Sequence, residues 1–177
     1  MKKLLFFLIL SSCCMSNGNA QTANDSITTA SPIEITTYYL IRHAEKDRSN
    51  PNNSDPELTK KGFFRAENWA EVLAEVPLDA VYSTEYTRTL MTASPTAKSK
   101  NLEITTYNPN DLNNPFFQEA TKGKTVLVVG HSNTTPQFVN KIIGEERYAS
   151  MDDTNNSSLF IVTKAGNQTS VQVLKIN

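Results

Sequence analysis

Cysteine and histidine are scarce in this chain of 177 residues, and each scarcity narrows the chemistry open to it. The two cysteines are the adjacent pair Cys13 and Cys14, so we expect a folded domain without a disulfide or thiol chemistry. The two histidines, His43 and His131, have no cluster of acidic residues around them in the sequence. Because zinc sites use three or four protein ligands, we expect no metal site.

Dense basic patches and long apolar runs are also missing. The formal net charge of -1, without a concentration of Lys and Arg, argues against a nucleic-acid partner. The apolar run from Leu4 to Leu10 follows Lys2 and Lys3 and is far shorter than the roughly 20 residues that cross a bilayer. This pattern predicts a secretory signal, and therefore an exported protein.

The cleavage site of the signal peptide determines whether the exported protein is lipid-anchored or soluble. Residues 10–13, Leu-Ser-Ser-Cys, resemble the lipobox of bacterial lipoproteins. We therefore favour a signal peptide over residues 1–12, lipidation of Cys13, and a polar, flexible tether over residues 13–32. This predicts a lipid-anchored protein on the periplasmic side of the cell envelope. The competing cut after residues 18–20, Gly-Asn-Ala, would release a soluble protein instead.

Residues 33–177 have the length and the pattern of one α/β domain. Apolar, β-branched runs alternate with helical patterns, which predicts a mostly parallel sheet with helices on both faces. The expected parallel strands are 35–41, 80–82, 102–107 and 125–129, and an antiparallel pair closes the domain over 158–163 and 170–176.

Four helices are expected between these strands. The first begins after an N-cap at Thr59 and ends before Pro77, with a buried face made of Phe63, Ala66, Ala70, Leu73 and Ala74. The second covers 86–98, with an interruption at Pro95 left open, and the third covers 116–121. The fourth runs to Ile143 from a cap at Thr135 and a first residue at Pro136.

The two histidines both follow predicted parallel strands, so the sheet alone would bring them to one edge. That carboxyl edge is where open α/β folds bind ligands. Arg42 precedes His43, and Arg88 follows the predicted strand 80–82. Arginine offers a planar fork of donors that matches phosphate oxygens. The sequence therefore predicts a phosphate site built from two arginines and two imidazoles.

Three motifs resemble those of a known family. Arg42-His43-Ala44-Glu45, the segment 83–93 around Arg88, and Gly130-His131-Ser132-Asn133 are similar in order and spacing to motifs of the histidine phosphatase superfamily, the phosphoglycerate mutase-like clan. The resemblance is to its small, single-domain bacterial members. It implies a three-layer phosphoglycerate mutase-like fold for residues 33–177.

The resemblance also implies a mechanism. His43 would attack phosphorus and become a phosphohistidine, while Arg42, Arg88 and a charged His131 neutralise the phosphoryl oxygens. No cofactor is implied. Asn133 would either bind phosphate or cap the helix that follows it.

The acid that protonates the leaving group is harder to find in the sequence. We favour Asp111, which lies near the position where mutase-like members carry their acid. Glu85 within the arginine motif and Glu119 are the alternatives, and Asp111 could instead serve only as a turn residue.

The expected function is hydrolysis of a phosphate monoester, either a small phosphorylated molecule or a phosphorylated envelope component. Phosphohistidine is a second candidate substrate. A non-catalytic lipoprotein that binds phosphate-bearing ligands is the alternative from a different class, and mutase activity is not expected.

Overall fold

The computed structural model describes residues 33–177. The predicted signal peptide 1–12, the tether 13–32 and Cys13 lie outside these residues. Within the described part of the chain, no helix is long and apolar enough to cross a membrane.

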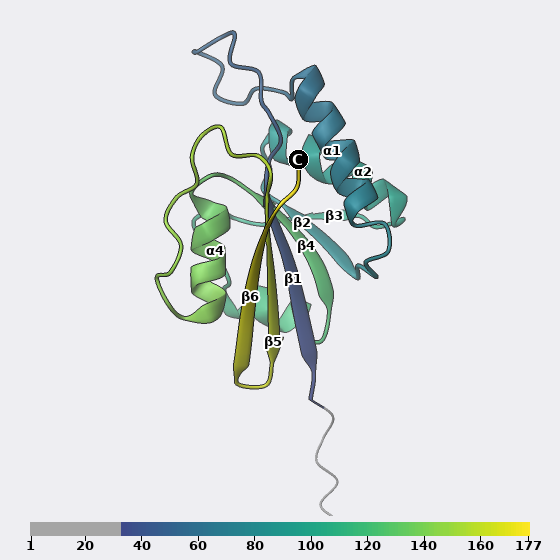
Figure 1. The fold of residues 1–177 in the computed structure, drawn as a ribbon, viewed down its shortest axis with the longest axis vertical. Coiled ribbons are helices and arrows are strands. Elements are labelled where there is room, and N and C mark those ends of the chain that lie inside the picture. The colour runs from purple at the N-terminus through teal and green to yellow at the C-terminus, as the bar shows by residue number, and fades with distance from the viewer. Residues whose placement is uncertain (1–32) are drawn as a thin grey trace, which may run out of the picture. The chain divides into compact units, whose positions relative to one another are not determined.

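Six strands form one mixed sheet in the order β3-β2-β4-β1-β5-β6 (Figure 1). Four neighbouring strands run parallel, and the last two are antiparallel to their neighbours. The strands are β1 (Ile35–Arg42), β2 (Ala80–Ser83), β3 (Ile104–Thr106), β4 (Thr125–Gly130), β5 (Ser158–Ala165) and β6 (Gln168–Lys175). The predicted mostly parallel sheet with an antiparallel C-terminal pair is confirmed.

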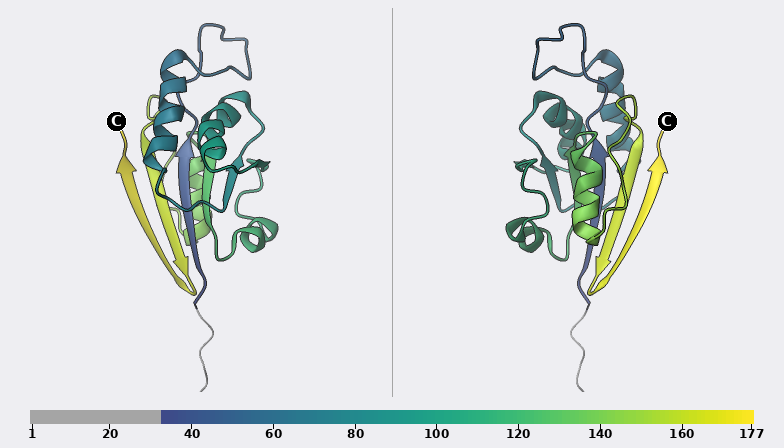
Figure 2. Two further views of the ribbon diagram at one scale, coloured as in Figure 1. Left: turned by 90° about the vertical axis from the view of Figure 1, so that its right-hand side faces the viewer. Right: turned by 90° about the vertical axis from the view of Figure 1, so that its left-hand side faces the viewer.

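Helices cover both faces of the sheet (Figure 2). α1 (Lys60–Val72) and α2 (Thr87–Ser99) pack on one face, whereas α3 (Pro115–Thr121) and α4 (Thr134–Ile143) pack on the other. The apolar strand β4 explains this arrangement, because alternate side chains of a strand point to opposite faces. Leu127 and Val129 join the core cluster under α1 and α2, while Val126 and Val128 join the cluster under α3 and α4. The predicted three-layer architecture is confirmed.

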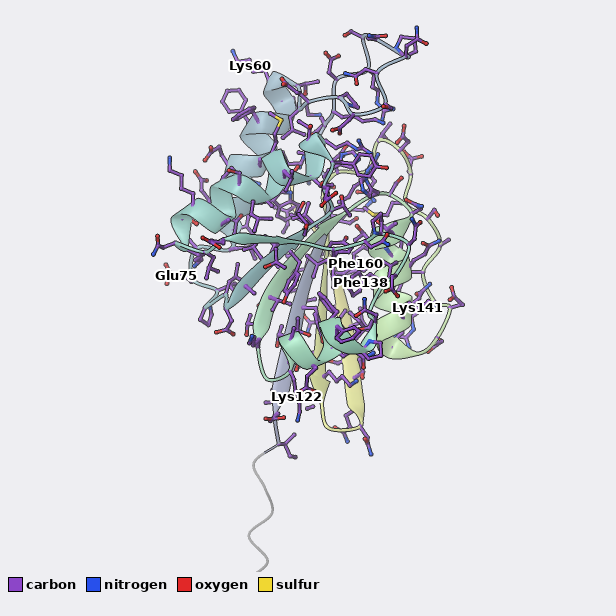
Figure 3. All side chains as sticks on the ribbon, turned by 180° about the vertical axis from the view of Figure 1, so that it is seen from behind. Lys60, Glu75, Lys122, Phe138, Lys141 and Phe160 are labelled. Carbon is purple, nitrogen blue, oxygen red and sulfur yellow. The ribbon has the colours of Figure 1, made fainter. Side chains whose placement is uncertain are left out.

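Each face has its own large core residues. Trp69 of α1 is fully buried on the first face. Phe138 of α4 and Phe160 of β5, both labelled in Figure 3, belong to the cluster on the second face. Burying an aromatic side chain of this size contributes about 1.5–3 kcal/mol. The central strands β1 and β4 are therefore packed by a hydrophobic core on each face of the sheet, and the two histidines follow the ends of these strands.

Helix α1 confirms the predicted N-cap but buries a different face. The Thr59 side chain accepts a hydrogen bond from the Gly62 amide, as expected of an N-cap. The buried face consists of Gly62, Ala66, Trp69 and Leu73, whereas Phe63 is half exposed. The prediction that Phe63, Ala70 and Ala74 are buried was therefore wrong. Gly62 sets the rotation, since a Cβ there would lie 2.2 Å from the Glu45 carbonyl oxygen.

Two helices differ from expectation near the site. α2 continues through Pro95 without a break. α4 begins at Thr134, so the cap predicted at Thr135 and the first residue predicted at Pro136 were wrong. The Thr134 hydroxyl accepts a hydrogen bond from the His131 amide at 3.0 Å, which draws the helix start closer to the histidine.

β3 is also shorter than expected because it pairs only with the short strand β2.

Candidate active site

The register of the two central strands brings the histidines together. β1 and β4 pair in parallel with Arg42 opposite Gly130, so both strands end level with one another. The His43 amide donates to the Gly130 carbonyl at 2.9 Å. The two imidazole centroids lie 5.5 Å apart, with their planes at 66°. The predicted meeting of His43 and His131 at the carboxyl edge follows from this pairing.

Gly130 permits a close approach around the second histidine. A Cβ at this position would lie 2.9 Å from both the Thr135 hydroxyl and the Tyr107 hydroxyl. The Tyr107 hydroxyl donates to the Val129 carbonyl at 3.2 Å, and the Thr135 hydroxyl donates to the Ile41 carbonyl at 3.2 Å. Only glycine leaves room for these two hydroxyls, of which Tyr107 bonds β4 and Thr135 bonds β1 close to the two histidines.

The contacts of His43 determine which nitrogen can attack. Its Nδ1 lies 2.8 Å from the Ala44 carbonyl oxygen, which can only accept a hydrogen bond, so Nδ1 carries the proton. The lone pair of the neutral ring is therefore on Nε2. Burial of the ring, together with the charges of Arg42 and Arg88, lowers the pKa of His43 to about 3. The imidazole is neutral at pH 7, as a nucleophile must be.

His131 is held by two neighbours through its two nitrogens. Arg88 Nη2 lies 3.4 Å from Nδ1, and because guanidinium can only donate, Nδ1 accepts. Nε2 then carries the proton and donates to the Thr84 hydroxyl at 3.0 Å. Burial and the charge of Arg88 lower the pKa of His131 to about 4. The ring is thus neutral in the free protein, which differs from the charged form that we expected.

Arg42 is buried and firmly positioned at the end of β1. Its side chain is 2% exposed, and Nη2 donates to Asp153 at 2.7 Å. Nη1 donates to the carbonyl oxygens of Asp152 and Asn155 at 2.9 and 3.2 Å. The segment between α4 and β5 therefore fixes the guanidinium from one side.

Arg88 is positioned from the loop that precedes α1. The Asp55 carboxylate accepts from the Thr87 amide at 2.9 Å and from the Thr87 hydroxyl at 2.7 Å, and lies 3.4 Å from Arg88 Nη1. The Arg88 guanidinium also lies over the Tyr86 ring, 4.3 Å from its centroid, and that ring packs edge-on against His131. Arg88, Tyr86 and His131 therefore form one packed group.

The two arginines share a feature that points to an anion. The Nε atoms of Arg42 and Arg88 are both buried and have no hydrogen-bond partner within residues 33–177. A buried guanidinium N–H without an acceptor is costly, and charge-assisted donors of this kind match phosphate oxygens. Lys46 lies near the same positive charges, since burial and the charges of Arg88 and Arg48 lower the pKa of its ammonium group.

Several residues of the site were missed in the sequence. Asp55 and Asp153 hold the two arginines, Thr84 holds His131, and Asn156 donates to the His43 carbonyl at 2.8 Å. Asp55, Asp153 and Asn156 lie in polar segments rich in Asp, Asn and Thr. Nothing in such a composition distinguishes the one carboxylate that meets an arginine from its neighbours. Thr84 was within the recognised arginine motif, and its place directly after β2 was the available signal.

The predicted acids are placed very differently from one another. Asp111 is exposed, and its carboxylate accepts from the Asn114 side chain at 2.9 Å, a contact that fits a turn residue. Glu85 is exposed beside Tyr86 and lines a cleft next to the site. Glu119 is exposed on α3, near the Lys122–Glu34 ion pair at the start of β1, which is the end of the sheet opposite to His43. Of the three, Glu85 has the position best suited to protonate a leaving group.

Asn133 is the N-cap of α4, but its side chain makes no capping hydrogen bond. Its expected role as a side-chain cap was therefore wrong, because the Thr135 amide donates to the His131 carbonyl and Pro136 has no N–H to offer. The Asn133 side chain is exposed, and its contact with phosphate stays a prediction.

Metal ligands do not gather in this part of the molecule. Residues 33–177 contain no group of three or more His, Cys, Asp or Glu side chains placed to hold an ion. The neighbours of the two histidines are arginines, a threonine and a tyrosine, which suit an anion better than a cation.

A family model and one curated relative match the first half of the domain. The model described as "Histidine phosphatase superfamily (branch 1)" matches residues 38–109. Phosphoserine phosphatase 1 of Hydrogenobacter thermophilus is 39% identical over 70 residues, which cover 37% of this chain and 33% of that protein. The aligned part therefore spans about a third of the length of this relative.

Solved structures match nearly the whole described domain. A protein from Agrobacterium tumefaciens described as a phosphohistidine phosphatase, SixA, superposes with a TM-score of 0.60 at 20% identity, over 80% of this chain and 99% of that one. Phosphoglycerate mutase from Bacillus anthracis superposes with a TM-score of 0.62 at 13% identity, over 80% and 93% of the two chains. At these identities the likeness shows the fold.

Residues 33–177 have the phosphoglycerate mutase-like fold. The predicted resemblance is confirmed over part of the domain: residues 38–109 match the model of the histidine phosphatase superfamily.

Proposed function

We propose that this protein is a phosphatase that hydrolyses phosphate monoesters through a covalent phosphohistidine on His43. One observation carries the proposal. Two arginines, each with a buried Nε–H that has no acceptor in the described residues, act through their charge on a neutral imidazole whose free nitrogen is Nε2. A phosphoryl group supplies oxygen acceptors to the arginines and an electrophilic phosphorus to that nitrogen.

The reaction has two balanced steps. In the first, the lone pair of His43 Nε2 forms a bond to phosphorus while the bond from phosphorus to the alcohol oxygen breaks, and the leaving oxygen takes a proton from an acid. In the second step, water attacks the phosphorus of the phosphohistidine and the P–N bond breaks. The proton of the attacking water passes to the group that gave up its proton in the first step. The products are the alcohol and inorganic phosphate, with His43 regenerated.

Arg42 and Arg88 would stabilise the charge on the equatorial oxygens, which is most of what phosphoryl transfer asks of a protein. A bound phosphate dianion close to His131 would raise the pKa of that ring from about 4. His131 would then become the charged donor expected for the bound state. The leaving oxygen would take its proton from Glu85 or from water; of the three predicted acids, Glu85 is the one that lines the cleft beside Tyr86.

The substrate class is a proposal as well. A small phosphorylated molecule or a phosphorylated envelope component would fit the exported protein predicted from residues 1–32. We propose that Cys13 is lipidated and anchors the domain to the membrane on the periplasmic side. Labelling cells with a palmitate analogue and comparing the full chain with its Cys13→Ala variant tests this anchor, and loss of label in the variant is the expected result.

The first experiment is turnover of p-nitrophenyl phosphate by residues 33–177 and by the His43→Ala variant. The variant should lose at least about a thousandfold in kcat, because the nucleophile is removed. Brief incubation of the wild-type domain with a phosphorus-32-labelled ester should also leave label on His43 that is stable to alkali and labile to acid. Equal turnover by both proteins would rule out the proposal.

A second candidate function is binding of a phosphate-bearing ligand without turnover. It is favoured by one observation: within residues 33–177 no carboxylate makes a hydrogen bond or an ion pair with His43 or His131. Tight binding of inorganic phosphate in calorimetry, together with no labelled His43 and no turnover of any ester, would identify this function instead.

A further inference from the structure

A cleft of about 570 Å³ opens beside Tyr86, which packs against His131. It is lined by Asp55, Glu85, Tyr86 and residues 106–109. Three of these residues tie it to the phosphate site. Tyr86 packs edge-on against His131 at 5.0 Å, and Asp55 contacts Arg88. Tyr107 reaches the Val129 carbonyl, next to Gly130. The cleft therefore adjoins His131 and Arg88, and it offers room for the alcohol portion of an ester whose phosphoryl group these residues bind.

The charge of the cleft is opposite to that of the phosphate site. Glu85 and Asp55 contribute two carboxylates, and none of the lining residues is basic. Asp55 is partly neutralised by Arg88, whereas Glu85 makes no ion pair with any residue of the described chain. A second hollow of about 290 Å³ shares Asp55 with the cleft, and its lining adds Asp47 and Glu57, again without a basic residue.

This arrangement selects among phosphate esters by charge. The arginines and Lys46 attract the phosphoryl group. A carboxylate on the alcohol portion would then lie near the Glu85 carboxylate, and repulsion between the two would weaken binding. An ammonium group in the same place would gain a charge-assisted hydrogen bond. An ester with an uncharged alcohol portion should bind with intermediate affinity. The hydroxyl, amide and aromatic groups of residues 106–109 and Tyr86 impose no charge of their own.

We propose that the substrates of this site are phosphate monoesters whose alcohol carries an ammonium group, and that Glu85 selects them. This inference rests on the proposed phosphatase function. In this role Glu85 acts as an ionised carboxylate, so for these esters the proton of the leaving oxygen comes from water.

Three two-carbon esters of nearly equal size test the assignment: 2-aminoethyl phosphate, 2-hydroxyethyl phosphate and 2-phosphoglycolate. Each is used as a competitive inhibitor of p-nitrophenyl phosphate hydrolysis, so that the leaving-group pKa does not enter. The inhibition constants should rise in the order given, with about a tenfold difference between the ammonium and the carboxylate ester. Raising the salt concentration should reduce the difference.

The Glu85→Gln variant should reduce the ratio of the two charged esters to about threefold or less, because a charge at the cleft is removed at nearly constant shape. Glu71→Gln removes the same charge from an exposed position outside the cleft and should leave the ratio unchanged. Equal inhibition by all three esters, a reversed order, or a ratio unaffected by Glu85→Gln would overturn the inference.

Failure of the phosphatase proposal is visible separately. If p-nitrophenyl phosphate is not hydrolysed, the proposed function fails, and dissociation constants of the same three esters measured by calorimetry still decide the charge preference of the cleft. If p-nitrophenyl phosphate is hydrolysed but the three esters inhibit equally, only the charge preference fails.

Discussion

The imidazole rings of His43 and His131 lie 5.5 Å apart, and a single backbone hydrogen bond from the His43 amide to the Gly130 carbonyl joins the strand ends that carry them. Both rings are buried and lie near arginines, so both lose their protons more readily than free histidine. This relationship makes the site responsive to pH, to packing at Gly130 and to the residues that hold each ring.

Both histidines should remain neutral across the neutral pH range. Burial and nearby arginines lower the pKa of His43 to about 3 and that of His131 to about 4, from an ordinary value of 6.5. Imidazole resonances followed by NMR in the ligand-free domain should therefore show no protonation between pH 8 and pH 5.5. Addition of inorganic phosphate should move the His131 titration upwards, because the dianion stabilises the charged ring. A midpoint near 6.5 for either ring in the free protein would contradict this prediction.

The same shift makes stability depend on pH. Because the unfolded chain binds a proton at each histidine near pH 6.5 and the folded chain does not, the unfolded state gains protons as pH falls. The free energy of unfolding should be highest above pH 6.5 and should decrease below it. The decrease should reach about 2 kcal/mol at pH 5 for each histidine that stays neutral in the folded protein. Urea unfolding at pH 7.5 and pH 5.0 measures the change. His43→Gln should weaken the dependence, and equal stability at both pH values would speak against a buried neutral ring.

Thr84 should matter through the orientation of His131. Thr84→Val removes the acceptor of the His131 Nε2–H at 3.0 Å and leaves a buried donor unpaired. The cost of about 1–3 kcal/mol should appear as roughly a tenfold or greater loss of kcat/KM, while Thr84→Ser keeps the hydroxyl and most of the activity. The His131 titration should also shift in the valine variant. Identical kinetics for the valine and serine variants would show that the hydroxyl has no positioning role.

Asp55 should support phosphate binding through Arg88. Asp55→Asn weakens the contacts with the Thr87 amide, the Thr87 hydroxyl and Arg88, so KM for p-nitrophenyl phosphate should rise about tenfold. Asp47→Asn is the matched control, since Asp47 lies in the same loop and its carboxylate accepts only from the nearby Ser49 amide among the described contacts. A lower KM in Asp55→Asn would mean that its negative charge opposes phosphate more than its hydrogen bonds help.

Gly130 should tolerate no side chain unless a neighbour makes room. Gly130→Ala places a methyl group 2.9 Å from the Tyr107 and Thr135 hydroxyls and should cost about 1–3 kcal/mol of stability. Tyr107→Phe removes one of these hydroxyls, so the double variant should recover part of the loss. Chemical denaturation of the four proteins in this cycle measures the coupling. Additive effects of the two substitutions would indicate that the two positions do not meet.

Parts of the fold and site were predictable because their signals are local. The apolar strands, the Thr59 cap and the placement of each histidine after a strand depend on residues close together in the sequence. Helix rotation was less predictable, because α1 has apolar residues on more than one side. The contact of Gly62 with the Glu45 backbone then decided that Trp69, and not Phe63, faces the core.

The sequence by itself determined the two histidines, the two arginines and the parallel strands that carry them. Only the tertiary structure decided that Asp153 meets Arg42 across 111 residues of sequence, that Asp55 holds Arg88, and that Nε2 of His43 is the free nitrogen. The reason is physical. A strand or a cap is specified by its neighbours in the chain, whereas the partner of a buried charge is specified by which loop folds back over it.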